Sequence, residues 1–553
     1  MSLMGIHFSH DSTVAFSPDG KRFVSYELER LIKERYFPID YKLMTHKPYL
    51  TEQSEFIAKT VADQVKKDFG EDCLTIESLT VDQLYPVDSV AANRKDFLDQ
   101  IKKYFNVLCE PRIIDHHRAH AFSAFYQSPY EEALVVTLDG GGYKKDNTTT
   151  QYFTIHYMNK NGVDRLIVDN NIHICSLYNA FPYLTKDIKG NINSVPGKAM
   201  GMQSYGTVYD KLYRKLKPLF YGFDWYYTVT KPDGTAIIEN DYIYNVVEEL
   251  FDLKNIRENK LEFWQGADLL ATVQQLFEEV VIENLKPHVY RYNLPIVMTG
   301  GAALNVLTNT RIKNEFKLPV FVPCNANDTG TAVGGIFEVV KPKEQVNLAF
   351  ANFDLFDREL LPNYIRDRNG KLTNNTEIIS HIRSGKIIGI VKGKSECGPR
   401  ALGNRSIICD PSFNNMKDIL NQKVKQREWY RPFAPMVLQS EASEYFVWDN
   451  SEAPYMSFSA HVRSKYQKFL ASITHVDYSA RIQTINEQDN PWYFKLLNDM
   501  KDSGLPVLLN TSFNIRGNPI LNTIEDAFYV LDNTELDMLY IEGYLFSKHR
   551  ENV

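Results

Sequence analysis

Two histidines one helical turn apart are the residues of this sequence with the clearest chemical meaning. The segment Asp115-His-His-Arg-Ala-His120 places His116 and His120 on one face if a helix begins there. Two imidazoles in that arrangement can bind one metal ion, and Asp139, which follows a short apolar run, can supply a third ligand. The same segment also fits an ordinary helix start, in which Asp115 caps the first turn and the histidines face solvent.

Three glycine-containing loops provide a second chemical feature. They are Asp139-Gly-Gly-Gly142, Gly300-Gly-Ala-Ala-Leu-Asn305 and Asp328-Thr-Gly330. Glycine lets a backbone approach a phosphate or a nucleobase closely, although any one of these loops could be only a tight turn. Because each loop follows a predicted strand, the set predicts a nucleotide held in a cleft between two related lobes.

A cationic cluster marks the C-terminal half of the chain. Guanidinium groups bind oxyanions through two parallel hydrogen bonds, and amides or hydroxyls complete such sites. The formal net charge of the chain is −7, so cations gathered beside glycine and proline favour a bound phosphate or pyrophosphate. A surface rich in ion pairs is the alternative. The segments concerned are Gly398-Pro-Arg-Ala-Leu-Gly-Asn-Arg405, Lys425 to Pro435, Arg481 and Asn510-Thr-Ser-Phe-Asn514.

Alternating strands and helices are expected to position these groups. Pro18-Asp-Gly20 predicts a hairpin near the N-terminus, an opening shared with actin-like ATPase domains. Apolar runs at 134–138, 294–298 and 317–323 predict buried strands ahead of the glycine loops, and residues 264–290 have helical spacing. The pattern breaks over residues 341–362, which predicts one domain over residues 1–350 and a second α/β domain over 351–553. The clearest strands of the second domain are expected at 386–391 and 505–509, and no internal repeat is visible.

Length and composition exclude several classes of protein. At 553 residues the chain is too long for one hydrophobic core. It has neither an apolar run long enough to span a membrane nor a visible secretion signal, so we expect a cytoplasmic protein without a membrane partner. None of its six cysteines forms a CxxC pair, which argues against a cysteine zinc site. The negative net charge argues against nucleic acid as the main partner.

The motifs, taken in order, resemble those of the O-carbamoyltransferases of antibiotic and nodulation-factor biosynthesis, over nearly the whole length. The resemblance implies an actin-like (ASKHA) two-lobed N-terminal domain, similar to the tRNA threonylcarbamoyl transferase subunit, and a YrdC-like α/β C-terminal domain. It also implies that carbamoyl phosphate and ATP form carbamoyladenylate, from which the carbamoyl group passes to a small-molecule alcohol. The motifs are His10-Asp-Ser12, His116 to His120, Leu138-Asp-Gly-Gly141, Gly197-Lys-Ala-Met-Gly201, Gly300 to Asn305, Asn327 to Gly330, Gly398 to Ser406, Arg431 to Pro435, Ala480 to Thr484 and Asn510 to Asn514.

The resemblance also implies roles for individual residues. His10 matches a histidine placed to act as base on the acceptor hydroxyl, and either Lys33 or Arg35 occupies the place of a family lysine that meets the adenylate. The cofactors implied are ATP, with Mg²⁺ as its usual companion, and Fe²⁺ or another divalent metal. The implied metal ligands are His116, His120, Asp139 and Asp328; the adenylate contacts are Gly140, Gly141, Gly300, Gly301 and Asn305; the carbamoyl phosphate and ATP site comprises Arg400, Lys425, Arg431, Arg481 and Asn510.

Three other functions compete with this one. A tRNA-modifying enzyme of the threonylcarbamoyl type is disfavoured by the acidic net charge, and a hydrogenase-maturation carbamoyltransferase by the absence of cysteine zinc motifs. A non-catalytic actin-like module would leave the arginine-rich half without a role. The acceptor pocket is expected around residues 207–262, where aromatic side chains can stack on sugar rings or pack in the core. The tyrosines concerned are Tyr209, Tyr213, Tyr221, Tyr226, Tyr227, Tyr242 and Tyr244.

Overall fold

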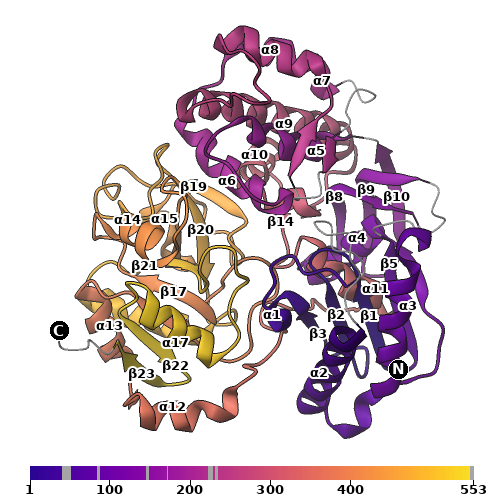
Figure 1. The fold of residues 1–553 in the computed structure, drawn as a ribbon, viewed down its shortest axis with the longest axis vertical. Helices are drawn as coiled ribbons and strands as arrows, with labels where there is room; N and C mark the ends of the chain where they lie inside the picture. The colour runs from indigo at the N-terminus through magenta and orange to yellow at the C-terminus, as the bar shows by residue number, and fades with distance from the viewer. Residues whose placement is uncertain are drawn as a thin grey trace. The chain divides into compact units, whose positions relative to one another are not determined.

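The computed structural model describes residues 1–39, 51–83, 87–144, 149–170, 172–221, 228–230 and 235–548. The chain divides into two compact units (Figure 1), one comprising residues 1–25 and 36–346 and the other residues 26–35 and 347–553. The third and last crossing, after residue 346, lies close to the boundary expected near residue 350. No sequence feature had assigned residues 26–35 to the second unit.

The first sheet of the first unit has the strand order β3-β2-β1-β5-β7. Strand β1 is antiparallel to β2 and parallel to β5, which is in turn parallel to β7. The predicted hairpin at Pro18-Asp-Gly20 is confirmed, since it joins the neighbouring strands β2 and β3. The strands are β1 (Leu3–His7), β2 (Thr13–Ser17), β3 (Val24–Glu27), β5 (Ser78–Gln83) and β7 (Arg112–Asp115).

The second sheet repeats this topology with different strands. Its order is β10-β9-β8-β13-β14, with β8 antiparallel to β9 and parallel to β13, and with β13 parallel to β14. Two sheets of equal strand order form the two related lobes of the expected actin-like fold, although no repeat is visible in the sequence. The strands are β8 (Glu132–Tyr143), β9 (Thr150–Asn159), β10 (Asp164–Asn170), β13 (Ile296–Thr299) and β14 (Val320–Phe321).

Two buried helices pack between the lobes. Helix α4 (His116–Gln127) contacts β8 and β13, and α11 (Thr331–Val340) contacts β1, β2 and β5. The two helices also pack closely on each other, because a Cβ atom at Gly334 would lie 1.9 Å from the carbonyl oxygen of Ala119. This packing holds the N-terminal ends of both helices, where His116 begins α4 and Asp328 begins the turn before α11.

A helical layer covers the second lobe. The helix predicted over residues 264–290 is confirmed as α9 (Phe263–Tyr292), which a capping box of Glu262 and Gln265 begins. Helices α5 (Ile174–Ala180), α6 (Val195–Met202), α7 (Asp210–Tyr221) and α10 (Val306–Phe316) pack on α9, and α8 (Asp241–Phe251) packs on α7. On the first lobe, α2 (Thr51–Phe69) and α3 (Val87–Tyr104) pack against each other.

The second unit is built on a mixed nine-stranded sheet. Its order is β15-β23-β22-β16-β17-β21-β18-β20-β19, and its apolar core includes α13 (Asn375–Arg383) and α16 (Pro491–Met500). The strands expected at 386–391 and 505–509 are confirmed as β16 and β21. The strands are β15 (Lys371–Leu372), β16 (Ile388–Val391), β17 (Arg405–Cys409), β18 (Ala434–Leu438), β19 (Phe458–His461), β20 (Ser479–Ile485), β21 (Val507–Ser512), β22 (Met538–Ile541) and β23 (Tyr544–Ser547).

The close helix crossing gives a stability prediction. Gly334→Ala should lower the free energy of unfolding by about 1–3 kcal/mol, because the added methyl overlaps the backbone of α4. Gly197→Ala is the matched control, since this exposed glycine of α6 has no atom within 4 Å of an added Cβ. It should stabilise the protein by about 0.5–1 kcal/mol through helix propensity. Urea unfolding of both variants measures these free energies. Equal changes in the two variants would contradict the close packing of α11 on α4.

Candidate metal and anion sites

The polar residues of the first unit gather at the carboxyl ends of its parallel strands. His7 ends β1, Asp82 lies near the end of β5, and His116 follows β7 as the first residue of α4. Asp139 lies in the later part of β8, and Asp328 begins the turn that leads into α11. Open α/β sheets bind ligands at this edge.

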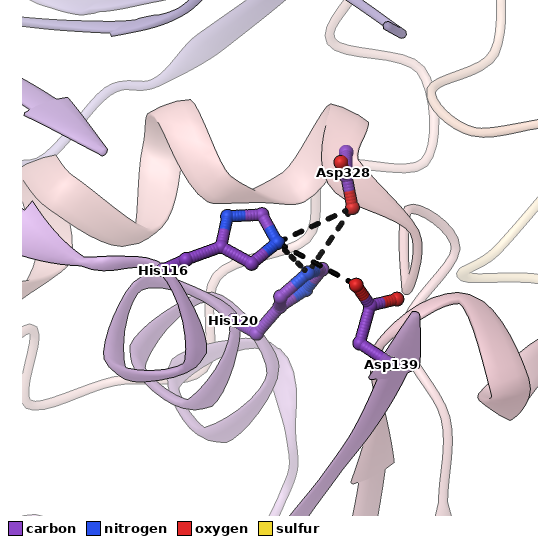
Figure 2. A group of neighbouring side chains, drawn as sticks. All are labelled: His116, His120, Asp139 and Asp328. Atoms are coloured by element: carbon purple, nitrogen blue, oxygen red, sulfur yellow. Dashed lines mark hydrogen bonds and ion pairs between the residues drawn. The ribbon is translucent and has the colours of Figure 1, made fainter. Parts of the chain in front are cut away.

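All four predicted metal ligands lie together, as Figure 2 shows. His116, His120, Asp139 and Asp328 each offer one ligand atom, and these atoms all lie within 4.8 Å of one another. The Nε2 atom of His120 lies 3.2 Å from Asp328 Oδ1, and that of His116 lies 3.6 Å from the same oxygen and 3.7 Å from Asp139 Oδ2. Ligands on a tetrahedral cation at about 2.1 Å would be roughly 3.4 Å apart, so the arrangement fits one divalent ion.

The donor atoms themselves favour a cation between them. The Nε2 atoms of His116 and His120 face each other at 3.2 Å, a distance that either one shared proton or one bound cation explains. Oδ2 of Asp328 is buried and accepts no hydrogen bond from the described residues. Two imidazoles and two carboxylates without sulfur suit iron, zinc or manganese, and the geometry does not select one of them.

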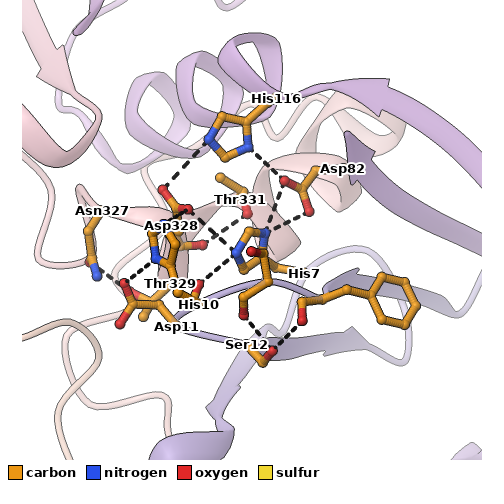
Figure 3. A network of polar contacts seen from close by, with 12 residues as sticks. His7, His10, Asp11, Ser12, Asp82, His116, Asn327, Asp328, Thr329 and Thr331 are labelled. Atoms are coloured by element: carbon orange, nitrogen blue, oxygen red, sulfur yellow. Dashed lines mark hydrogen bonds and ion pairs between the residues drawn. The ribbon is translucent and has the colours of Figure 1, made fainter. Parts of the chain in front are cut away.

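A second layer of hydrogen bonds holds the proposed ligand His116 (Figure 3). Asp82 Oδ2 lies 2.7 Å from His116 Nδ1, and both its oxygens lie within 3.0 Å of His7 Nδ1. His116 thus donates through Nδ1 and turns Nε2 towards the ligand cluster, where a metal would take the place of its proton. His7 in turn donates through Nε2 to the backbone oxygen of His10, at 2.9 Å.

Burial and the close opposite charges shift the pKa values of this network. Burial alone would raise the pKa of Asp82, but His7 and His116 outweigh it and hold that pKa well below its ordinary value. The pKa of Asp139 is likewise lowered, against burial, by His116 and His120. Conversely, Asp328 raises the pKa of His116 against the effect of burial. The carboxylates are therefore ionised, as metal ligands must be.

His10 lies beside the ligand cluster and is partly exposed. Its Nε2 atom lies 3.5 Å from Asp328 Oδ2, and its Nδ1 atom lies 3.2 Å from Asp11 Oδ2. Burial would lower the pKa of His10, but Asp328 and then Asp11 outweigh it and raise the pKa to about 9. The proposed base is therefore directly coupled to a proposed metal ligand.

Hydrogen bonds from backbone N–H groups join the Gly300-Gly301 loop to Asp139 of the first glycine loop and to Ala326, just before the third. The Gly301 N–H donates to Asp139 Oδ1 at 2.6 Å, and the Gly300 N–H donates to the Ala326 carbonyl at 2.8 Å. Gly300 has φ of 88°, and a Cβ there would lie 2.4 Å from the Leu138 oxygen, so close packing alone requires this glycine. Gly140 is exposed and has open space around it, and Gly141 follows it with φ of 137°.

Asn305 has protein partners that account for much of its hydrogen bonding. Its Oδ1 atom accepts from the Thr308 N–H, which caps α10, and from Gln274 Nε2. Its Nδ2 atom donates to Gln274 Oε1, which also accepts from the hydroxyl of Tyr178. The structure thus gives Asn305, which lies four residues after Gly301, a structural role as the cap of helix α10.

The cationic residues predicted in the second unit lie close enough to perturb one another. Burial, then Arg427, Arg431 and Arg35, lower the pKa of Lys425 well below its ordinary value. Burial, then Arg400, Arg427 and Arg431, do the same to the pKa of Arg481. The Nε atom of Arg481 is buried and has no hydrogen-bond partner among the described residues. Cations that lie this close together favour binding of an anion, so these residues form a candidate anion site.

Two of the predicted contacts hold the loops of this site together. The Lys425 ammonium, 2.7 Å from the Asn514 backbone oxygen, also donates to the Asn514 side chain and to Ser512. Asn510 Nδ2 donates to the Ala401 carbonyl at 3.0 Å and to Gln483 Oε1 at 2.7 Å. Oδ1 of Asn510 is buried and accepts no hydrogen bond from described residues.

Lys33 and Arg35 both belong to the second unit. Lys33 is half-exposed and pairs with Asp526 at 2.9 Å, whereas Arg35 contributes to the lowered pKa of Lys425. Of the two, Arg35 is therefore the one associated with the cationic cluster.

The tyrosines expected at an acceptor pocket mostly have partners within their own layer. The Tyr213 hydroxyl donates to Glu279 at 2.6 Å, Tyr209 packs edge-on against Phe251, and Arg257 covers the buried ring of Tyr244. Tyr221 has a buried hydroxyl and Tyr242 is 50% exposed. Tyr226 and Tyr227 lie outside the described residues. These contacts indicate that the described tyrosines pack within the helical layer and do not line a common acceptor pocket.

Sequence reasoning missed His7, Asp82 and Arg427, which the structure places at these sites, and it counted Arg405 in the cationic cluster, where the structure gives it a structural role. His7 and Asp82 hold the proposed ligand His116, and the strand-then-acid pattern that indicated Asp139 also occurs at Asp82. Arg427 belongs to the cationic cluster and lies in the same run as Lys425 and Arg431. Arg405 is fully buried, donates to the backbone oxygens of residues 392, 393 and 404, and is thus a structural residue.

Comparison with known proteins identifies relatives along nearly the whole chain. The family description "Carbamoyltransferase N-terminus" matches residues 2–337, and "Carbamoyltransferase C-terminus" matches residues 379–548. Nodulation protein NolO of Bradyrhizobium diazoefficiens is 30% identical over 460 residues, which cover 79% of each chain. Nodulation protein NolNO of Sinorhizobium fredii is 31% identical over 79% of this chain and 64% of its own length. Nodulation protein U of B. diazoefficiens is 24% identical over 99% of this chain and 97% of its own.

Solved structures are more distant. Full-length HypF in its phosphate- and nucleotide-bound form is 11% identical, covers 62% of this chain and 55% of its own, and has a TM-score of 0.34. The ROK hexokinase of Thermus thermophilus is 12% identical over 61% of this chain and all of its own, with a TM-score of 0.29. At these scores the likeness carries no argument, so the fold assignment rests on the strand orders. No described helix is long and apolar enough to cross a membrane.

The hydrogen bond from His116 to Asp82 gives the prediction for this site. Asp82→Asn should weaken Fe²⁺ or Zn²⁺ binding about 10- to 100-fold, because an amide does not fix the Nδ1–H tautomer of His116. Asp164→Asn is the matched control, since this buried acid of the same unit pairs with Arg118 instead of a proposed ligand. Metal titration of the apoproteins measures both. Unchanged affinity in Asp82→Asn would show that His116 needs no such support or binds no metal.

Proposed function

Because the chain belongs to the carbamoyltransferase family, we propose that it is an ATP-dependent O-carbamoyltransferase. These matches confirm the family that the motifs indicated. In this proposal the second unit forms carbamoyladenylate from carbamoyl phosphate and ATP, and the first unit transfers the carbamoyl group to the hydroxyl of a small acceptor. The observation that carries the proposal is the cluster of closely spaced cations in the second unit of a chain whose net charge is −7.

The cationic cluster supports the adenylate-forming step. Carbamoyl phosphate and the triphosphate of ATP, with its Mg²⁺, are anions, and the mutual repulsion of Lys425, Arg427 and Arg481 is relieved when such anions bind. Water releases phosphate from carbamoyl phosphate, and a carbamate oxygen then attacks the α-phosphorus of ATP, which expels pyrophosphate. Arg400 and Arg431 would stabilise the charge that develops on the phosphoryl oxygens.

The first unit has the groups that the transfer step needs. Gly140, Gly141, Gly300 and Gly301 would let the backbone approach the adenylate closely. His116, His120, Asp139 and Asp328 would hold a divalent metal, which when bound polarises an oxygen of the mixed anhydride. His10 would take the proton of the attacking hydroxyl, whose pKa lies far above 7. AMP then leaves as the carbamoyl C–O bond forms.

The base role of His10 depends on the charge of its neighbour. Asp328 raises the pKa of His10, so a free Asp328 favours the imidazolium form, which cannot take a proton. A cation bound to Asp328 would offset that charge and favour the neutral imidazole. The ligand cluster and the base would therefore work as one site in the first unit.

We propose a sugar or another natural-product alcohol as the acceptor. Several relatives carry names of nodulation proteins, which supports a role in biosynthesis. The acidic net charge supports a small molecule over tRNA.

Pyrophosphate release should require ATP and carbamoyl phosphate together. The reason is that carbamate derived from carbamoyl phosphate is the nucleophile that displaces pyrophosphate. A coupled phosphate assay with each substrate omitted in turn measures this, after correction for the phosphate of carbamoyl phosphate itself. Equal pyrophosphate release from ATP alone would exclude the adenylation mechanism.

Arg400→Ala and Arg431→Ala should each slow pyrophosphate release about 10²- to 10³-fold, a loss of roughly 3–4 kcal/mol in transition-state stabilisation. Lysine at either position should restore only part of the rate, because a point charge lacks the planar fork. Arg366→Ala is the control, since this arginine of the same unit is exposed and pairs with Asp367. If Arg400→Ala or Arg431→Ala releases pyrophosphate as fast as Arg366→Ala does, the arginine replaced in that variant is not part of the site.

A further inference from the structure

A short segment from the N-terminal part of the chain is built into the second unit. Residues 26–35 belong to that unit, and their helix α1 (Leu28–Ile32) is followed by Lys33 in the left-handed region. The Tyr26 ring stacks on Phe353 with centroids 4.7 Å apart, and the Glu27 N–H donates to the Asn352 side chain at 3.1 Å. The segment is therefore packed into this unit along its length.

Glu27 and Arg30 form a buried ion pair within this segment. Both are at most 1% exposed, and Arg30 Nη2 lies 2.9 Å from Glu27 Oε2. A buried ion pair contributes little net stability unless further hydrogen bonds satisfy it. Here the further hydrogen bonds of the pair are all with the backbone of residues 396–398.

The contacts of this ion pair fix the start of the loop formed by residues 398–405. Arg30 Nη2 donates to the carbonyl oxygens of Glu396 and Gly398, each at 3.1 Å, and Glu27 Oε1 accepts from the Gly398 N–H. Gly398 has φ of 87°, a conformation that other residues rarely adopt. Asn352 Nδ2 adds a further bond to the Glu396 carbonyl at 3.0 Å.

The Glu396 carboxylate fixes the end of the same loop. One oxygen, Oε1, accepts from four successive backbone N–H groups, those of residues 402–405, at 2.9–3.0 Å. Glu396 is fully buried, so this carboxylate occupies a concave set of amides that would otherwise attract an external anion. The amides of residues 402–405 are thus occupied by the protein itself, which leaves the side chain of Arg400 as the proposed substrate contact of this loop.

We propose that Glu27 and Arg30 are positioning residues for the anion site of the second unit, acting through residues 396–398 on the loop that carries Arg400. The inference rests on the proposed function of that site. Arg400 lies between the two anchored ends of the loop, two residues after Gly398 and two before the amides bound by Glu396. A shift of the first anchor therefore displaces the guanidinium group on which binding of carbamoyl phosphate depends.

The test compares three variants of the full-length protein. Glu27→Gln/Arg30→Gln removes both charges, so no uncompensated charge is left buried. Arg30→Lys keeps the charge but lacks the planar fork that reaches two carbonyls. Arg366→Ala is the control from the same unit, because Arg366 is exposed and pairs with Asp367.

We expect the double variant to lose about 10²-fold in kcat/KM for carbamoyl phosphate, mainly through KM, because small displacements of a positioning group have effects of this size. It should also lose the stabilisation that inorganic phosphate gives the wild type in thermal unfolding, while metal binding by the first unit stays unchanged. Arg30→Lys should recover part of the loss, and Arg366→Ala should behave as wild type.

Two results would overturn the inference. One is a double variant with wild-type KM and wild-type phosphate stabilisation. The other is a double variant that also loses metal binding, which would show a general folding defect. Absence of carbamoyl phosphate-dependent pyrophosphate release in the wild type would instead refute the proposed function, and the phosphate stabilisation of each variant would still decide the positioning role.

Discussion

The carboxylate of Asp82 lies between two buried imidazoles, and the proposed metal site depends on this interaction. A buried carboxylate is costly without partners, and His7 and His116 supply them. One of these bonds turns the free nitrogen of His116 towards His120 and the two acidic ligands. The other leads through His7 to the backbone oxygen of His10. A single buried charge thus orients a ligand on α4 and the loop that carries the proposed base.

The second unit differs from the first, since several cations lie close together in its candidate anion site. Burial, followed by Arg427 and Arg431, lowers the pKa values of Lys425 and Arg481, and Lys425 and Asn510 hold the loops of the site by bonds to Ser512, Asn514 and Ala401. Glu396 accepts from the backbone amides of residues 402–405, whereas the cationic side chains of the unit lie close to one another. Such an arrangement favours an external anion over an internal one, which is the electrostatic basis of the proposed substrate site.

Sequence patterns predicted the parts of the fold that have strong local signals. Helix α9, strands β16 and β21 and the hairpin at Pro18-Asp-Gly20 follow from periodicity and turn chemistry. The ligand set of His116, His120, Asp139 and Asp328 comes together as the resemblance implied. By contrast, the assignment of residues 26–35 to the second unit depends on contacts with residues more than three hundred positions away, which no local pattern carries. The equal strand order of the two lobes is also invisible in the sequence, because it is a property of pairing rather than of side chains.

The central claim is that metal-dependent transfer and anion-dependent adenylation use different residues in the two units. The most direct measurement is to determine bound metal and carbamoyl phosphate-dependent pyrophosphate release together in His120→Ala and in Arg400→Ala. The account predicts that folded His120→Ala loses the metal and keeps pyrophosphate release, whereas Arg400→Ala keeps the metal and loses pyrophosphate release. If folded His120→Ala stops pyrophosphate release as well, the two steps share one active site and the account is wrong.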